Sequence, residues 1–162
     1  VYQIEGVRVI VWAIDPGPTQ SAMVSFDGCH VLRHAIWPND DLLIELIGFT
    51  PATDVLVIEQ IAGMGMAVGA EVFETCFWSG RFIQAWPGTA WDRLKRLPIK
   101  IHLCGTAKAK DANVRQALID RFGPGKEKAI GTKKAPGPLY GLKGDEWSAL
   151  AVAITWWDTR RT

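Results

Sequence analysis

Three acidic residues stand where an unpartnered charge is costly. Asp15 ends an apolar run that begins at Val9, Glu59 lies near the end of the apolar segment 54–61, and Asp145 precedes an apolar helical segment. A carboxylate in such a setting needs a compensating partner, and a cation commonly provides it at a functional site. Asp15 taken alone could instead accept hydrogen bonds from its own Pro-Gly turn. The recurrence of the pattern favours a shared site.

Carboxylates that converge on one point suit Mg²⁺ or Mn²⁺, which prefer hard oxygen ligands. In a two-metal site, the ions lie about 3.5–4 Å apart, activate a water and stabilise the leaving oxygen of a phosphodiester. We therefore interpret Asp15, Glu59 and Asp145 as candidate metal ligands and catalytic residues, with two ions per site.

The charge distribution along the chain indicates the class of substrate. Residues 1–92 hold three basic and eleven acidic side chains, whereas residues 93–143 hold thirteen basic and three acidic ones. The two segments carry about −8 and +10 charges, which the net charge of +1 conceals. Such an asymmetry indicates a polyanionic partner.

Hydrophobic patterning predicts the elements that must position the three acids. An apolar run bounded by turn residues is typical of a strand, and an apolar stripe of period 3.6 is typical of a helix. The predicted strands cover residues 7–14, 21–26, 30–37, 54–61 and 99–104, and the predicted helices cover residues 39–47, 70–86, 111–122 and 145–160. Asn39 is expected to cap its helix, and residues 123–143 are expected to form a mobile loop.

This order predicts an α/β fold in which the first three strands form an antiparallel meander. The first and fourth strands can then lie side by side, with the last helix packed across them. With 162 residues, 48% of them apolar, the chain is predicted to form a single domain, residues 1–162. No apolar run reaches the roughly 18 residues of a membrane span. No secretory signal pattern is visible, so a cytoplasmic location is expected.

The helix over 70–86 carries apolar side chains on more than one side. Such a helix needs cover on more than one side, which favours a homodimer. A single deeply buried core helix is the alternative.

Four segments in the same order resemble the RuvC-like Holliday-junction resolvases, a branch of the ribonuclease H-like nucleases. They are Ile14-Asp15-Pro16-Gly17, Ile58-Glu59-Gln60, the GTAKAKDANVRQAL segment 105–118, and Gly144-Asp145-Glu146 with the ALAVAI run 149–154. The resemblance implies a ribonuclease H-like mixed five-stranded sheet flanked by helices. It also implies a homodimer that resolves four-way DNA junctions by paired symmetric nicks with Mg²⁺ or Mn²⁺. The compact chain suits a bacteriophage version, acting in the cytoplasm of a bacterium or an infected host.

The resemblance assigns the metal-binding and catalytic role to Asp15, Glu59 and Asp145. The family places two acids three residues apart on the last helix, and the second of these falls at Ser148. The fourth carboxylate is therefore missing. Glu146 is a candidate substitute, although it points about 100° around the helix from Asp145.

Further residues are DNA-binding candidates. Lys108 and Lys110 fall in the basic segment that the family uses near the scissile phosphate, and generic phosphate binding is the competing interpretation. Met64 and Met66 fall in the loop where the family probes the branch point, since apolar wedges can unstack bases; loop filler is the alternative. The remaining candidates for phosphate contacts are Arg115, Lys133 and Lys134.

Three other functions are consistent with the sequence. One is a nuclease of broader specificity for forks and flaps, and another is a junction-binding module impaired by the missing acid. The third is an ATP-using protein of the actin-like group, whose phosphate loop also follows a strand-end Asp-x-Gly. That fold needs two such domains, and 162 residues hold only one.

Overall fold

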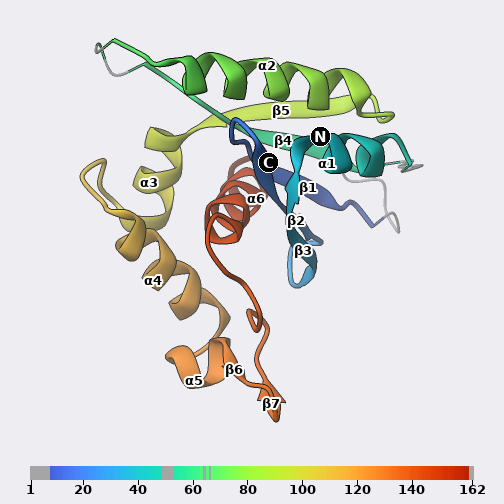
Figure 1. Cartoon of the computed structure of the whole chain (residues 1–162). Helices are drawn as coiled ribbons and strands as arrows, with labels where there is room; N and C mark the ends of the chain where they lie inside the picture. Colours follow the sequence, from blue (N-terminus) through green and yellow to red (C-terminus); the bar gives the residue numbers. More distant parts are fainter. Residues whose placement is uncertain (1–7, 49–52, 64, 66, 161–162) are drawn as a thin grey trace.

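A five-stranded mixed sheet forms the centre of the computed structural model (Figure 1), which describes residues 8–48, 53–63, 65 and 67–160. The strand order is β3-β2-β1-β4-β5; β1 to β3 pair antiparallel, and β1, β4 and β5 pair parallel. The strands are β1 (Val11–Asp15), β2 (Gln20–Phe26), β3 (Val31–Pro38), β4 (Val55–Gln60) and β5 (Ala90–Lys95). The predicted fold class and the predicted adjacency of the first and fourth strands are thus confirmed.

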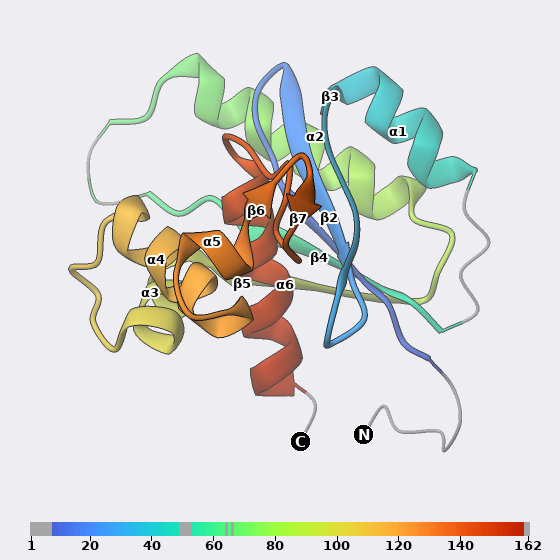
Figure 2. The ribbon, with the colours of Figure 1, turned by 90° about the horizontal axis from the view of Figure 1, so that it is seen from below.

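Helices cover both faces of this sheet. Helices α1 and α2 lie on one face, and α6 lies against the other, with α3 and α4 beside it (Figures 1 and 2). The helices are α1 (Asn39–Ile47), α2 (Ala70–Ala85), α3 (Arg96–Cys104), α4 (Asp111–Phe122), α5 (Lys126–Ala129) and α6 (Glu146–Arg160). Among the helices that the structure describes, none is long and apolar enough to cross a membrane.

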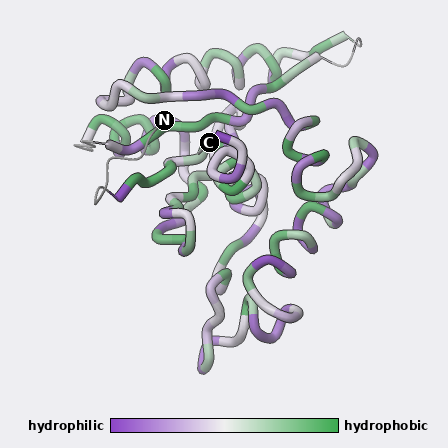
Figure 3. The backbone as a smooth tube through the Cα atoms, turned by 180° about the vertical axis from the view of Figure 1, so that it is seen from behind, coloured by the Kyte–Doolittle hydropathy of each residue, from purple (hydrophilic) through white to green (hydrophobic). Residues whose placement is uncertain are grey.

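The central strands are apolar on both faces because each face has its own core. Val11 and Ala13 of β1 pack in the cluster that contains α6, whereas Trp12 and Ile14 pack in the cluster formed with α1 and α2. Successive side chains of one strand therefore pack alternately in the two hydrophobic cores. In Figure 3, α2 and α4 alternate between hydrophobic and hydrophilic colouring, as expected of helices with one packed and one exposed side.

The prediction of a strand over 99–104 was wrong, because these residues belong to α3. Their alternating apolar pattern resembles a strand, but Pro98 is tolerated in the first turn of a helix. Gly105 then ends the helix in the left-handed conformation, with φ of 71°. The fifth strand is β5 instead, an edge strand whose polar, exposed residues gave little hydrophobic signal.

Two local predictions also need correction. The N-cap of α1 is Pro38, while Asn39 is the first helical residue and makes no side-chain cap. The Asn39 amide is instead buried between Ser21 Oγ (2.7 Å) and the Gly17 carbonyl oxygen (2.9 Å), so it joins the helix to the sheet. The segment expected to be a loop contains α5 and a small hairpin of β6 (Gly131–Thr132) and β7 (Ala135–Pro136).

Candidate active site

Parallel pairing of β1 and β4 brings two of the predicted acids together. The register aligns Val11 with Val55 and continues to Ile14 with Ile58, so Asp15 and Glu59 follow at the same edge of the sheet. The apolar residues before each acid fix this register, because a slip by one residue would turn the buried side chains to the opposite face.

The third predicted acid reaches the same edge from the start of α6. Asp145 directly precedes this helix, and its carbonyl oxygen accepts the Ala149 N–H at 3.0 Å. Helix α6 packs across β1, β2 and β4, which places its N-terminus next to the ends of β1 and β4. The three acids named from the sequence therefore lie in one region of the structure.

The electrostatic environment of Asp15 shows that negative charge is concentrated there. Burial, followed by the neighbouring carboxylates of Glu59 and Asp145, raises the pKa of Asp15 from 3.8 to about 7. Two weaker influences oppose this rise, the positive charge of Arg96 and a hydrogen bond from the Ser148 hydroxyl. A cation near Asp15 would favour its ionised form.

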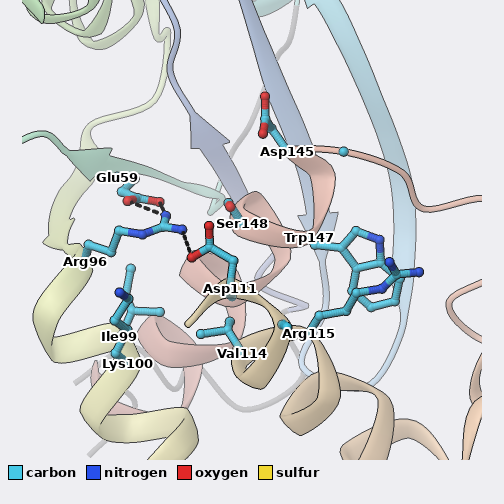
Figure 4. A pocket seen from close by; sticks show the side chains of 13 residues that line it. Glu59, Arg96, Ile99, Lys100, Asp111, Val114, Arg115, Asp145, Trp147 and Ser148 are labelled. Atoms are coloured by element: carbon cyan, nitrogen blue, oxygen red, sulfur yellow. Dashed lines mark hydrogen bonds and ion pairs between the residues drawn. The ribbon is translucent and has the colours of Figure 1, made fainter. Parts of the chain in front are cut away.

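Arg96 is a site residue that the sequence interpretation missed. Its Nη1 donates to Glu59 Oε1 at 2.9 Å and to Oε2 at 3.2 Å, and its Nη2 donates to Asp111 (Figure 4). The nearby carboxylates raise the pKa of Arg96 above its usual value, although burial opposes this. Because residues 99–104 were interpreted as a strand, Arg96 fell in an unassigned linker among many basic residues.

A cavity of about 380 Å³ opens beside these groups. Acidic, basic and apolar side chains line it together, a composition that suits a phosphate ester next to a cation site. Figure 4 shows the side chains that line it. They belong to Glu59, Arg96, Ile99, Lys100, Asp111, Ala112, Val114, Arg115, Asp145, Trp147, Ser148 and Ala151, with Gly144 contributing backbone.

Glu146 does not join the three acids. Its side chain is buried, with only 1% exposure for the residue, and its Oε2 accepts the Lys143 N–H at 2.8 Å. The same oxygen lies 3.1 Å from His34 Nδ1 on β3. The turn of the helix directs Glu146 toward the sheet, so the structure does not support it as a substitute for the fourth acid. Ser148 instead faces Asp15.

The predicted DNA-binding residues lie in different places. Arg115 lines the cavity, with its guanidinium 4.6 Å from the centroid of a Trp147 ring. Lys108 and Lys110 are exposed in the segment before α4, outside the cavity lining. Lys133 and Lys134 are exposed in the hairpin between β6 and β7. Met64 and Met66, named as branch-point residues, lie outside the described residues.

The donor set fits a hard divalent ion by its chemistry, because its members are carboxylates and the buried Asp15, with its raised pKa, lies near the carboxylates of Glu59 and Asp145. As the side chains lie, however, the described residues contain no group of three His, Cys, Asp or Glu close enough to hold an ion. Figure 4 shows Asp145 apart from the linked group of Glu59, Arg96 and Asp111. A guanidinium already occupies one side of Glu59.

Comparisons with known proteins bear on the fold. No protein-family model matches the sequence, and no curated protein matches it. A solved structure of Thermus thermophilus RuvC matches with a TM-score of 0.62 and 18% identity, covering 94% of this chain and 96% of that one. A structure of T. thermophilus RuvC in complex with a Holliday junction substrate matches with a TM-score of 0.60 and 17% identity, covering 90% and 91%. The chain therefore has a RuvC-like, ribonuclease H-like fold.

Proposed function

We propose that this protein is a metal-dependent endonuclease that resolves four-way DNA junctions by paired symmetric nicks. The observation that carries the proposal is the proximity of Asp15 to Glu59 and Asp145, which raises the pKa of Asp15. Glu59 and Asp145 also line a cavity that contains the basic side chains of Arg96, Lys100 and Arg115. The RuvC-like fold supports it, since one structural neighbour was solved with a Holliday junction substrate.

The three acids would hold divalent Mg²⁺ or Mn²⁺, with Asp15 and Glu59 fixed by the sheet and Asp145 by the start of α6. When bound, such an ion lowers the pKa of a water and stabilises the leaving oxygen of a phosphodiester. Ser148 would keep Asp15 oriented through its hydrogen bond. Lys100 and Arg115 line the cavity and would bind the phosphates that flank the scissile one.

The surface of α2 supports a homodimer, which would place two active sites on one junction. Phe73 and Phe77 are 66% and 58% exposed on α2. An apolar groove lies beside Phe77 and extends to Leu43 on α1. Exposed aromatic rings next to such a groove are typical of a surface covered by a partner.

The function is tested with a labelled four-way junction, a matched linear duplex and a three-way branch. Each is incubated with the wild type and with Asp15→Asn, in Mg²⁺ and separately in Mn²⁺. We expect paired symmetric nicks in the four-way junction, and their loss in Asp15→Asn. Equal cutting of all three substrates would replace the proposal with a nuclease of broader specificity.

A junction-binding module without catalysis is a second candidate. Two observations favour it: Ser148 stands where a fourth acid is expected, and Arg96 already engages both oxygens of Glu59. This candidate predicts tight binding of the four-way junction with no nicks in either metal. The same incubation, combined with a gel-shift measurement on each substrate, separates the two functions.

A further inference from the structure

Both the strand pairing that precedes Arg96 and its ion pairs fix its position in the active site. It follows β5 directly, and the register pairs Lys95 with Gln60, so Arg96 emerges beside the end of β4. Its guanidinium is then held between Glu59 and Asp111, on two sides. A positive charge fixed between carboxylates occupies the kind of position that a metal ion takes.

The charges that act on Asp15 can be counted from the side chains named as its main influences, which do not include the cavity residues Lys100 and Arg115. Asp15, Glu59 and Asp145 carry three negative charges when ionised, and Arg96 offsets one of them. The remaining two are neutralised by one divalent ion, whereas two such ions would leave an excess of positive charge. Asp111 is exposed, so water screens its charge more effectively.

The residue at position 148 also favours one divalent ion over two. The Ser148 hydroxyl donates a hydrogen bond to Asp15 and brings no negative charge to the side of the site formed by α6. Both oxygens of Glu59 also accept from Arg96, so a second ion on Glu59 would lie close to a guanidinium. Like charges at such a distance repel, most strongly where water is excluded.

We propose that the site binds one divalent ion per chain and that Arg96 supplies the second positive charge. The inference deepens the proposed function and rests on it only in that the acids bind a divalent ion. A guanidinium has five N–H donors, and the contacts to Glu59 and Asp111 use at most three of them. The others are available to a phosphate oxygen in the cavity, a pairing that arginine geometry favours.

The test measures the number of Mn²⁺ ions per chain by isothermal titration calorimetry, and detects paired ions by electron paramagnetic resonance. The wild type is expected to bind one Mn²⁺, with the spectrum of an isolated ion. The double variant R96Q/S148D adds a carboxylate and removes the guanidinium, so it should bind two coupled ions. The matched control R96K/S148D keeps a positive charge and should bind one.

Single-turnover cleavage of the four-way junction provides a second readout. R96Q should slow cleavage by about 100- to 1000-fold, as loss of a donor to a transition-state oxygen does. R96K should slow cleavage by a smaller factor, because lysine keeps the positive charge. Arg33→Gln is the control, because Arg33 lies on β3 beside Trp37, outside the basic segment 93–143, and does not line the cavity. Circular dichroism spectra and melting temperatures check that each variant folds.

The outcomes separate this inference from the proposed function. Two coupled Mn²⁺ ions in the wild type would overturn the single-ion site, even if the junction is nicked as expected. One Mn²⁺ without any nicking would support the single-ion site and contradict the nuclease. If the wild type binds no Mn²⁺, both proposals are wrong. If R96K/S148D binds two ions as R96Q/S148D does, the charge of Arg96 does not set the stoichiometry.

Discussion

At the scale of single residues, Asp15 couples the stability of the protein to its proposed function. Its pKa in the folded protein is about 7, compared with 3.8 for an ordinary aspartate, so folding favours the protonated form. The stabilising contribution of that proton is complete below about pH 4 and is lost as the pH rises to about 7. Burial and the repulsion from Glu59 and Asp145 both disfavour an ionised Asp15, and a cation beside it would offset both effects.

We therefore predict that removing the titratable group flattens the pH dependence of stability. In the presence of a chelator, the free energy of unfolding of Asp15→Asn should gain about 2–3 kcal/mol relative to the wild type between pH 5 and pH 8. Urea unfolding at several pH values measures this gain. Asp120→Asn, on the exposed side of α4, is the control. Parallel pH profiles for the wild type and Asp15→Asn would contradict the prediction.

At the scale of elements, α3 shows how periodicity can mislead. The alternation of Ile99, Ile101 and Leu103 predicts a strand with all three side chains on one face, yet the segment is helical. In the helix, Ile99 packs in the core with 3% exposure, while Ile101 is 49% exposed. This change of element determines the site, because α3 begins with Arg96 and also carries Lys100.

Two truncations distinguish the helix from the strand. Ile99→Ala should lower the free energy of unfolding by about 2–4 kcal/mol, because it removes buried methyl groups and leaves a cavity. Ile101→Ala should cost less than about 1 kcal/mol, since the side chain already contacts solvent. Chemical denaturation of both variants measures the difference. Equal losses would favour a strand with both side chains buried on one face.

At the scale of the whole molecule, the acidic side chains of the site and most basic side chains come from different parts of the chain. The strands and α6 supply the acids of the site, whereas most basic side chains lie in the segment from β5 through α5 and the β6–β7 hairpin. Figure 2 shows α3, α4 and α5 grouped on one side of α6. A substrate backbone bound along this side would pass the cavity, which suits recognition by shape and charge.

This arrangement predicts that binding of the four-way junction is strongly salt-dependent. The dissociation constant should rise at least about tenfold between roughly 50 and 200 mM salt. The double variant Lys133→Gln/Lys134→Gln should show a shallower dependence. Arg8→Gln, outside the basic segment, should not change it. Gel-shift titrations at several salt concentrations test both statements, and an affinity insensitive to salt would contradict the role given to this segment.

The proposed homodimer is tested through α2. Phe77→Glu should convert the dimer to a monomer, because it places a charge in an apolar interface, while the melting temperature of the chain changes little. Light scattering coupled to size exclusion measures the mass. Leu97→Glu is the control, since Leu97 is 54% exposed on α3, away from α2. A monomeric wild type at micromolar concentration would exclude the dimer interface on α2.

The sequence by itself determined four of the five strands of the central sheet, most helices and the three acids as candidates. Continuous apolar runs fix buried strands, and a charge at the end of such a run is a local signal that needs no distant contact. Asp15, Glu59 and Asp145 were identified in this way, and the structure places them in one region.

Only the tertiary structure decided which other side chains surround these acids. β5 is an edge strand with weak hydrophobic signal, and it becomes a strand through its pairing with β4. That pairing brings Arg96 to Glu59, a contact between residues far apart in the chain. The orientation of Glu146 toward His34 likewise follows from how α6 docks on the sheet. Contacts of this kind depend on packing between elements, which residue type and spacing do not encode locally.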